Sequence, residues 1–223
     1  MNEEKTEGIV LRSLEYKDSQ RIVSVFTPYA GMISVLIKGI SSRNLPLLSL
    51  CNPFSRVEFL IKRKNSELLT FVDGSLLDSN LPLRQAFSSL AIAGQMAQSI
   101  LTSQLAGKSS ADTYFLFRSY LKQIPTFQAP EILLASFQLK FLTAEGLLAL
   151  SATCNLCDRQ AEILSQGESL CRLHSTGADA SFTAEEWSIL LTLHHAKHFS
   201  QLRTLSCHPS LLHKIDIYFK KRL

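Results

Sequence analysis

Three of the five cysteines lie within residues 154–171, and their spacing is typical of a metal site. Cys154 and Cys157 are separated by two residues, and Cys171 and His174 repeat this spacing after thirteen further residues. Two such hooks can hold a tetrahedral ion from opposite sides, and three thiolates with one imidazole suit Zn²⁺ better than cations that prefer oxygen. All four ligand positions are filled, so we predict one structural Zn²⁺ per chain and no open coordination position.

Two alternatives to this ligand set stay open. The cysteines could be a chance cluster of buried thiols, or Cys207 or His208 could replace His174, because a second Cys-x-x-Cys hook is more common. The pair Gln166-Gly167 is expected to form the turn that joins the two arms. Cys51 and Cys207 are expected to be small core or subsurface residues. The odd number of cysteines and their crowding argue against a disulfide framework and indicate a reducing cytoplasm.

Other motifs with chemical potential are incomplete. His194 and His198 have metal-ligand spacing on a helix, but no glutamate follows His194, so we interpret them as a solvated helix face. Gly107-Lys108-Ser109 resembles the end of a phosphate-binding loop, but Thr102 occupies the position of its first glycine. No Gly-x-Ser-x-Gly sequence occurs. We therefore predict no catalytic residues and a protein that is not an enzyme.

Basic side chains in the first 80 residues are the second feature that could perform a chemical function. They flank the ends of predicted strands, where lysine and arginine could contact nucleic-acid phosphates. The expected DNA-binding residues are Arg12, Lys17, Arg21, Lys38, Arg43, Lys62, Arg63 and Lys64. Because acidic residues lie nearby and loop aromatics are sparse, each of these charges could instead serve only solubility.

Five short β-type runs are expected to position these basic residues. Turn-forming sequences separate the runs, and the longest gap lies between the third and the fourth, where an OB-fold commonly holds an extra segment. The expected strands are 8–11, 21–26, 32–37, 57–61 and 68–72. An OB-fold therefore leads over other small barrels and sandwiches, and its strand 2–3 face and neighbouring loops commonly bind oligonucleotides.

The apolar pattern becomes helical after residue 81. Leu83, Phe87, Leu90, Ala91 and Gly94 follow the spacing of one buried helix face. Four further helix signals follow, namely an apolar pattern over 111–123, Pro130, a capping box over 183–186 and Pro209. The predicted fold class is α+β, with an OB-fold domain over 1–80 and an all-α domain over 81–223 that carries a zinc-binding insertion at about 151–180.

Composition agrees with a globular protein. Of the 223 residues, 46% are hydrophobic and 19% are charged, which excludes extensive disorder. The formal net charge of +4 is too small to establish a polyanionic partner. The polar N-terminus and the absence of about 18 consecutive apolar residues predict neither a secretory signal nor a membrane-spanning helix, and we expect a cytoplasmic protein.

The N-terminal region contains a series of motifs in a fixed order, namely Tyr16-Lys17-Asp18-Ser19-Gln20-Arg21-Ile22-Val23, Phe26-Thr27, Gly31, Lys38-Gly39 and Asn52-Pro53-Phe54. The order of these motifs resembles that of the RecO family of bacterial recombination mediators. The similarity covers the N-terminal barrel, the helical region and the four-ligand hook. The sequence differs from the family pattern at Asp18, where glutamate is usual, and at His174, where cysteine is usual. One basic residue stands after Lys38-Gly39, where several arginines are usual.

This resemblance implies a non-catalytic, nucleoid-associated DNA repair protein. Such a protein would bind single- and double-stranded DNA, anneal complementary strands and, with RecR, load RecA onto strands coated by single-stranded DNA-binding protein (SSB), whose C-terminal tail it would contact. Two other function classes stay open. The chain could be a zinc-containing scaffold that docks a protein without binding DNA, or a metal-dependent hydrolase, which the closed ligand set disfavours.

Overall fold

The computed structural model describes residues 3–63, 67–175 and 177–223. The chain divides into two compact units, Met1–Pro125 and Thr126–Leu223. Lys64 lies outside the described residues. In the described part of the chain, no helix combines the length and the apolar character that crossing a bilayer requires.

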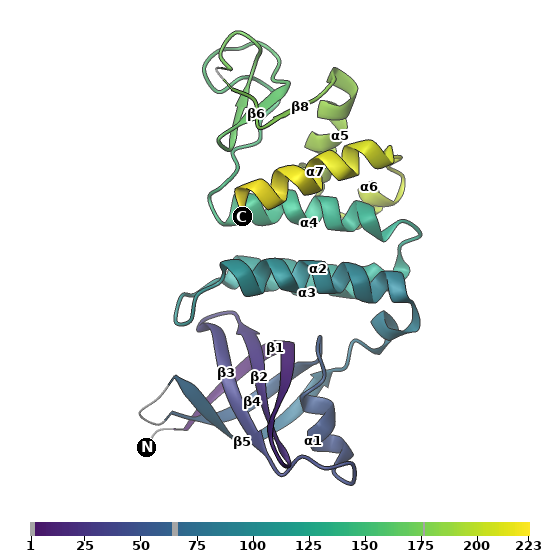
Figure 1. Cartoon of the computed structure of the whole chain (residues 1–223). Coiled ribbons are helices and arrows are strands. Elements are labelled where there is room, and N and C mark those ends of the chain that lie inside the picture. The colour runs from purple at the N-terminus through teal and green to yellow at the C-terminus, as the bar shows by residue number, and fades with distance from the viewer. Residues whose placement is uncertain (1–2, 64–66, 176) are drawn as a thin grey trace. The chain divides into compact units, whose positions relative to one another are not determined.

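Strands of the N-terminal unit form a closed barrel (Figure 1). Within the described residues, the strands are β1 (Glu3–Lys17), β2 (Gln20–Thr27), β3 (Gly31–Lys38), β4 (Arg56–Lys62) and β5 (Leu68–Asp78). Their order around the barrel is β1-β2-β3-β5-β4, and β3 and β5 run parallel whereas the other neighbours are antiparallel. The predicted OB-like barrel is confirmed, and a short helix α1 (Leu45–Leu50) lies between β3 and β4.

The barrel closes because apolar side chains alternate along its strands. In β3, for example, Ile33, Val35 and Ile37 are buried, and the residues between them are more exposed. Alternation with a period of two directs every second side chain into the barrel. Leu50 and Cys51, at the end of α1, join the same core. The strand residues of this core are Val10, Val23, Val25, Ile33, Val35, Ile37, Val57, Phe59, Ile61 and Leu69.

Helices of the N-terminal unit follow the barrel in the chain. They are the short 3-10 helix η1 (Leu81–Gln85), α2 (Phe87–Ser103) and α3 (Ala111–Gln123). Gly31 allows a close approach between the barrel and the α2–α3 loop, because a Cβ there would lie 2.4 Å from the Lys108 carbonyl oxygen. The positive φ of Gly31, 61°, also favours glycine.

The predicted buried face of α2 is wrong. Phe87 is 87% exposed, and the buried residues of α2 include Ile92, Met96 and Ile100. The reason is that Leu83 belongs to η1 and Ala86 is extended, so the helix begins at Phe87 and its register differs from that of one continuous helix.

Glu7 in β1 connects the barrel to α3. Its carboxylate accepts a hydrogen bond of 2.6 Å from the Tyr114 hydroxyl and one of 3.0 Å from Arg56, and the Arg118 guanidinium lies 3.6 Å away. The N-terminal compact unit accordingly extends beyond the end of the barrel, to Pro125. A domain boundary at residue 80 stays a prediction.

Electrostatics favour the charged form of Glu7. Burial alone would raise the pKa of Glu7, but the Tyr114 hydrogen bond and the charges of Arg56 and Arg118 outweigh it, so this pKa lies below its ordinary value. Burial and the bond to Glu7 raise the pKa of Tyr114. A carboxyl group whose pKa is lower in the folded state stabilises the fold above its unfolded pKa, and this contribution is lost as the pH falls through the folded pKa.

Removing the Tyr114 hydroxyl should therefore destabilise the N-terminal unit. We expect Tyr114→Phe to lower the free energy of unfolding by about 1–3 kcal/mol, the usual range for a hydrogen bond to a charged group. The loss of stability between pH 5 and pH 3 should become shallower, because Glu7 loses one partner of its ionised form. Urea unfolding at several pH values measures both effects. Tyr29→Phe is the matched control, since Tyr29 is 73% exposed, and equal behaviour of the two variants would contradict the prediction.

The C-terminal unit consists of helices and a small sheet. Its helices are α4 (Pro130–Ala144), α5 (Ala184–His195), α6 (Phe199–Arg203) and α7 (Pro209–Arg222), after the short η2 (Ile124–Thr126). The sheet has the order β7-β6-β8, with β6 (Ile163–Ser165), β7 (Glu168–Leu170) and β8 (Ala180–Ser181). α4 packs against α5 and α7. The sequence predicted α4, α5 and α7 but neither α6 nor the sheet.

The predicted capping box at the start of α5 is confirmed. The Glu186 backbone N–H donates to the Thr183 hydroxyl at 3.1 Å, and the Thr183 backbone N–H donates to the Glu186 carboxylate at 2.9 Å. Two N–H groups at the helix start are satisfied in this way, which fixes where α5 begins.

Candidate metal centre and nucleic-acid interface

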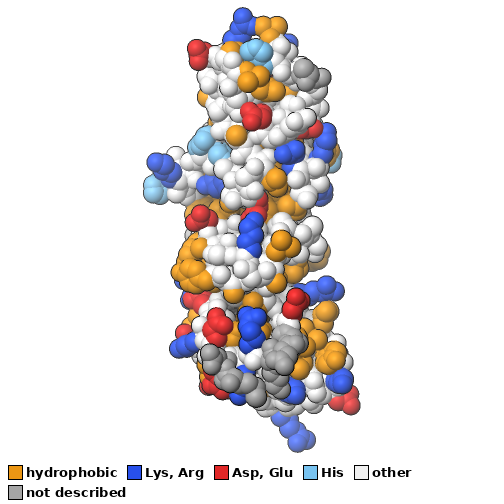
Figure 2. Space-filling model, turned by 90° about the vertical axis from the view of Figure 1, so that its left-hand side faces the viewer, with side chains coloured by type: hydrophobic (Ala, Val, Ile, Leu, Met, Phe, Trp, Pro, Cys, Tyr) orange, Lys and Arg blue, Asp and Glu red, His pale blue; other side chains and the backbone are white. Residues whose placement is uncertain are grey.

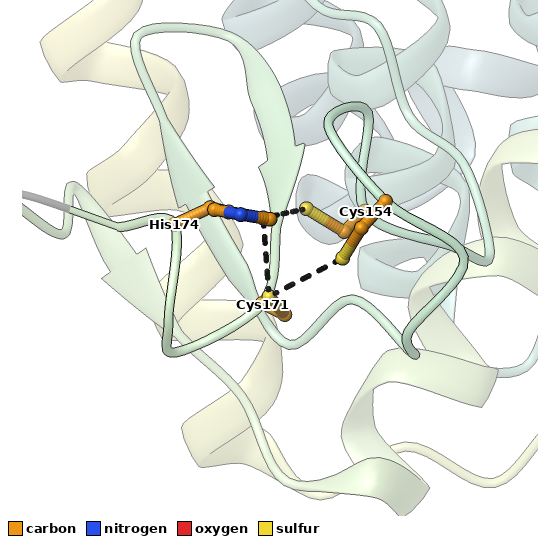
Figure 3. Close-up of side chains that lie close together, drawn as sticks. Cys154, Cys171 and His174 are labelled. Atoms are coloured by element: carbon orange, nitrogen blue, oxygen red, sulfur yellow. Dashed lines mark hydrogen bonds between the residues drawn. The ribbon is translucent and has the colours of Figure 1, made fainter.

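The structure brings the four predicted metal ligands together (Figure 3). The Sγ atoms of Cys154, Cys157 and Cys171 and a ring nitrogen of His174 all lie within 4.8 Å of one another. The His174 Nδ1 atom is 3.4 Å from Cys154 Sγ and 3.6 Å from Cys171 Sγ, and Cys157 Sγ is 3.8 Å from Cys171 Sγ. In the part of the chain that the structure describes, Cys207 and His208 do not belong to this group.

These separations fit a tetrahedral zinc ion. Bonds of about 2.3 Å to sulfur and about 2.0 Å to nitrogen at tetrahedral angles place two sulfur ligands about 3.8 Å apart, and sulfur about 3.5 Å from nitrogen. The observed separations of 3.8 Å between the Cys157 and Cys171 sulfur atoms, and of 3.4 and 3.6 Å between sulfur and the His174 nitrogen, agree with these values. The donor set is also that of a structural zinc site, because four protein ligands complete a tetrahedron.

Two similar turns build the hooks. The Cys157 backbone N–H donates to the Cys154 carbonyl at 3.2 Å, and the His174 N–H donates to the Cys171 carbonyl at 3.1 Å. Between the hooks, β6 and β7 form a hairpin whose turn is Gln166-Gly167, as expected from the sequence. Both turn residues have positive φ values, 51° and 88°, as the favoured two-residue hairpin turn requires. The hairpin thus places the second hook, Cys171 and His174, beside the first hook, Cys154 and Cys157.

The surroundings of the cysteines favour a thiolate at Cys154. Burial would raise the pKa of Cys154, but hydrogen bonds from backbone N–H groups and from His174 lower it to about 6. A backbone hydrogen bond lowers the pKa of Cys157, but burial and the neighbouring thiols outweigh it, so this pKa is raised. The positive charge of a bound cation would offset the repulsion between thiolates and would therefore favour the deprotonated form of each coordinating thiol.

Four of the predicted DNA-binding residues gather at one end of the barrel. Lys17 and Arg21 flank the β1–β2 turn, and Lys38 lies next to Gln20 in the β2–β3 pairing. The Ile40 backbone N–H donates to the Ser19 carbonyl at 3.0 Å, which brings the segment that carries Arg43 toward the same turn. A hollow of about 540 Å³ lies between the β1–β2 turn and residues 40–42. We call Lys17, Arg21, Lys38 and Arg43 the turn cluster.

The cations of the turn cluster differ in their partners. Arg21 pairs with Glu15 at 3.1 Å, and the Lys17 ammonium lies 5.4 Å from the centre of the Tyr16 ring. Lys38 and Arg43 are exposed and have no ion pair among the described residues. These two side chains therefore carry the charge that is least neutralised by neighbours.

The other predicted residues lie elsewhere. Arg12 is opposite Ser24, closer to the middle of β1, and is exposed. Lys62 ends β4, where its ammonium is 4.0 Å from Glu3, and the exposed Arg63 follows it. Lys64, the third member of the predicted basic tip, is outside the described residues. Figure 2 shows basic and acidic side chains interspersed on this view of the barrel, so the structure does not gather all predicted cations into one patch.

Basic residues at the end of α7 are held within their own unit. Lys220 pairs with Asp216 and Lys221 with Asp179, each at 2.6 Å. Arg222 donates to the carbonyls of Leu147 and Gln166 at 3.3 Å. This second basic run therefore supports the base of the segment that carries the four candidate ligands, and its charges are already engaged.

Comparisons with known proteins agree with these features. A family model described as "Recombination protein O N terminal" matches residues 1–80. The chain is 31% identical over 205 residues to the DNA repair protein RecO of Chlamydia pneumoniae, covering 91% of this chain and 81% of that protein. The chain belongs to the RecO family. The RecO protein of Chlamydia trachomatis serovar L2 is 31% identical over 221 residues, with 97% and 90% coverage.

More distant RecO proteins also match. That of Bacillus cytotoxicus is 26% identical over 178 residues, which cover 77% of this chain and 71% of that protein. The predicted membership of the RecO family is thus confirmed.

Sequence reasoning missed the residues that support the sites. The indole N–H of Trp187 donates to the Ser151 carbonyl at 3.2 Å, which anchors the hook to α5. The Asn155 side chain donates to Glu168 at 2.7 Å and links the first hook to β7. Spacing could not identify these contacts, because they join residues that are 13 to 36 positions apart without a repeated motif.

Proposed function

We propose that the chain is a DNA repair protein that acts as a recombination mediator. It binds single- and double-stranded DNA through its barrel and anneals complementary strands. With RecR, it helps to load RecA onto DNA strands coated by SSB, whose C-terminal tail it contacts. Membership of the RecO family supports this proposal, because the matched relatives carry the name DNA repair protein RecO.

The observation that carries the DNA-binding proposal is the turn cluster. Lys38 and Arg43 are exposed and have no ion pair among the described residues, and Lys38 pairs with Gln20, which itself pairs with Lys17 at the end of the OB-like barrel. Unpaired cations can neutralise phosphates and release counterions, which favours binding without sequence preference. Arg12, Lys62, Arg63 and Lys64 would extend this contact along the DNA.

Annealing requires no catalytic residue. A surface that holds two strands raises their local concentration and lowers the repulsion between their phosphates. The metal would be a structural Zn²⁺ held by Cys154, Cys157, Cys171 and His174, and it would supply folding energy to the hook. We propose accordingly that the protein is not an enzyme and acts in the cytoplasm.

Strand annealing tests this function directly. Two complementary labelled oligonucleotides should anneal faster with the full chain than in buffer, and the acceleration should diminish as salt rises, because phosphate contacts weaken. Fluorescence quenching of the paired labels measures the rate. An unchanged annealing rate together with undetectable DNA binding would reject the proposal and favour a scaffold that docks only proteins.

A further inference from the structure

The hollow beside the β1–β2 turn combines apolar, aromatic and polar lining residues. Its volume is about 540 Å³. The buried Ile40 and the partly buried Leu48 of α1 line it, together with Tyr16 near the end of β1. The bases of DNA are flat rings with an aromatic face and polar edges, and they stack on aromatic side chains whatever their sequence. A lining of this kind therefore suits a base.

The backbone presents Tyr16 outside the regular strand pairing. Where β1 pairs with β2, Glu15 is opposite Arg21, whereas Lys17 is opposite Gln20. Tyr16 is therefore the extra residue of a β-bulge, an irregularity that redirects a side chain and is common next to functional sites. The Tyr16 side chain is 52% exposed, so a ligand can reach its ring without a change in the fold.

The charged residues of the hollow balance one another. Lys17 and Arg21 supply two positive charges to the lining, and Glu15 and Asp18 supply two negative charges, so the formal charge of the lining is zero. The carboxylates would repel a phosphate, whereas an uncharged base meets no such repulsion. The two unpaired cations of the turn cluster do not line the hollow and stay available for phosphates.

We propose that this hollow holds one unpaired DNA base, stacked on the Tyr16 ring, while the turn cluster holds the neighbouring phosphates. The Lys17 ammonium lies 5.4 Å from the centre of that ring. A cation and an aromatic surface thus lie side by side, as the phosphate and the base of one nucleotide do. This inference rests on the proposed DNA binding and adds a contact to the base.

Such a subsite distinguishes single strands from duplexes. A base in a duplex is paired and stacked, and it can enter a protein pocket only after it leaves the helix, which costs free energy. A base in a single strand avoids most of this cost. The hollow consequently favours single-stranded DNA and releases its base when a complementary strand pairs with it.

Binding of a normal and an abasic strand by the full chain tests the proposal. The two labelled probes are a thymidine oligonucleotide and a deoxyribose phosphate strand of equal length without bases, so their charges are equal. Fluorescence anisotropy should show that the parent binds the abasic strand about fivefold more weakly or less tightly still, because stacking one base on an aromatic side chain changes affinity by at least this factor. Tyr16→Ala should lose the preference for the thymidine strand, whereas Tyr16→Phe, which keeps the ring, should retain it.

Two controls separate stacking from an electrostatic or structural effect. The salt dependence of binding by Tyr16→Ala should keep the parent slope, because no phosphate contact is lost. Tyr29→Ala is the matched variant, since Tyr29 is an exposed tyrosine in the turn between β2 and β3, at the opposite end of β2. It should bind both strands like the parent, and circular dichroism should show that every variant keeps its fold.

The outcomes distinguish this inference from the function on which it rests. Equal binding of both strands by the parent would overturn the base subsite and leave DNA binding intact. A Tyr16→Ala variant that keeps the parent affinity and the parent preference would overturn the subsite as well. A parent that binds neither strand would reject the proposed DNA-binding function, and the inference with it.

Discussion

Replacing Cys154 with serine is expected to reduce the zinc content from about one ion per chain to near zero and to unfold the hook. Structural zinc binding is worth about 10–16 kcal/mol in isolated zinc-finger peptides, so its loss removes a large local stabilisation. The other supports of the hook are the small sheet and hydrogen bonds such as those of Trp187 and Asn155. The buried cluster of the hook contains Cys154, Cys171 and Leu170, with Cys157 packed against them, so most of its members are ligands.

Metal analysis and hydrogen exchange over residues 151–175 measure these two effects. Amide protection should be lost in the hook and retained in the barrel, whose core is separate. Cys207→Ser is the matched control, since Cys207 is a free, partly buried cysteine outside the ligand group. Less than half an equivalent of zinc in the parent, purified without chelator, would contradict the prediction.

Reversing the charges of Lys38 and Arg43 should weaken DNA binding by about tenfold or more. Each lost phosphate contact forgoes the release of a counterion, and at about 0.1 M salt this lowers affinity several-fold per contact. Both side chains are exposed, so the double variant Lys38→Glu/Arg43→Glu should melt close to the parent temperature. Fluorescence anisotropy with a single-stranded oligonucleotide measures the affinity.

Three further variants show whether the position of a charge matters beyond the net charge. Lys197→Glu changes an exposed lysine of the C-terminal unit and should bind DNA like the parent, whereas Lys38→Glu alone should bind more weakly. Lys62→Glu/Arg63→Glu should have a smaller effect than the Lys38/Arg43 pair, because Lys62 already lies near Glu3. Equal loss of affinity in Lys197→Glu and Lys38→Glu would reject the turn cluster as the contact surface.

Local sequence rules predicted the features whose determinants are close in the chain. The spacing of the paired hooks predicted the ligand group, and Thr183 with Glu186 predicted the start of α5. Both features depend on a fixed spacing between residues that are close in the chain. Short β-type runs separated by turn-forming sequences predicted the strands of the barrel for the same reason. The resemblance to the RecO family then predicted the order of these features along the chain, namely the barrel, the helical region and the four-ligand hook.

Features that depend on distant contacts could not be predicted in this way. The predicted helix face around Phe87 was wrong, because η1 and the extended Ala86 interrupt the helical pattern. The Glu7–Tyr114 bond joins residues 107 positions apart. Likewise, Lys221 pairs with Asp179, which lies outside α7, so this ion pair becomes evident only once the C-terminal unit is folded.

The salt dependence of single-stranded DNA binding tests the central proposal most directly. Affinity of the full chain should fall linearly on logarithmic axes as salt rises, with little difference between one sequence and its scrambled version. In Lys38→Glu/Arg43→Glu the slope should become shallower by about 1.4, since each phosphate contact to a single strand contributes about 0.7. An affinity that is independent of salt, or an identical slope in the double variant, would contradict DNA binding through the turn cluster.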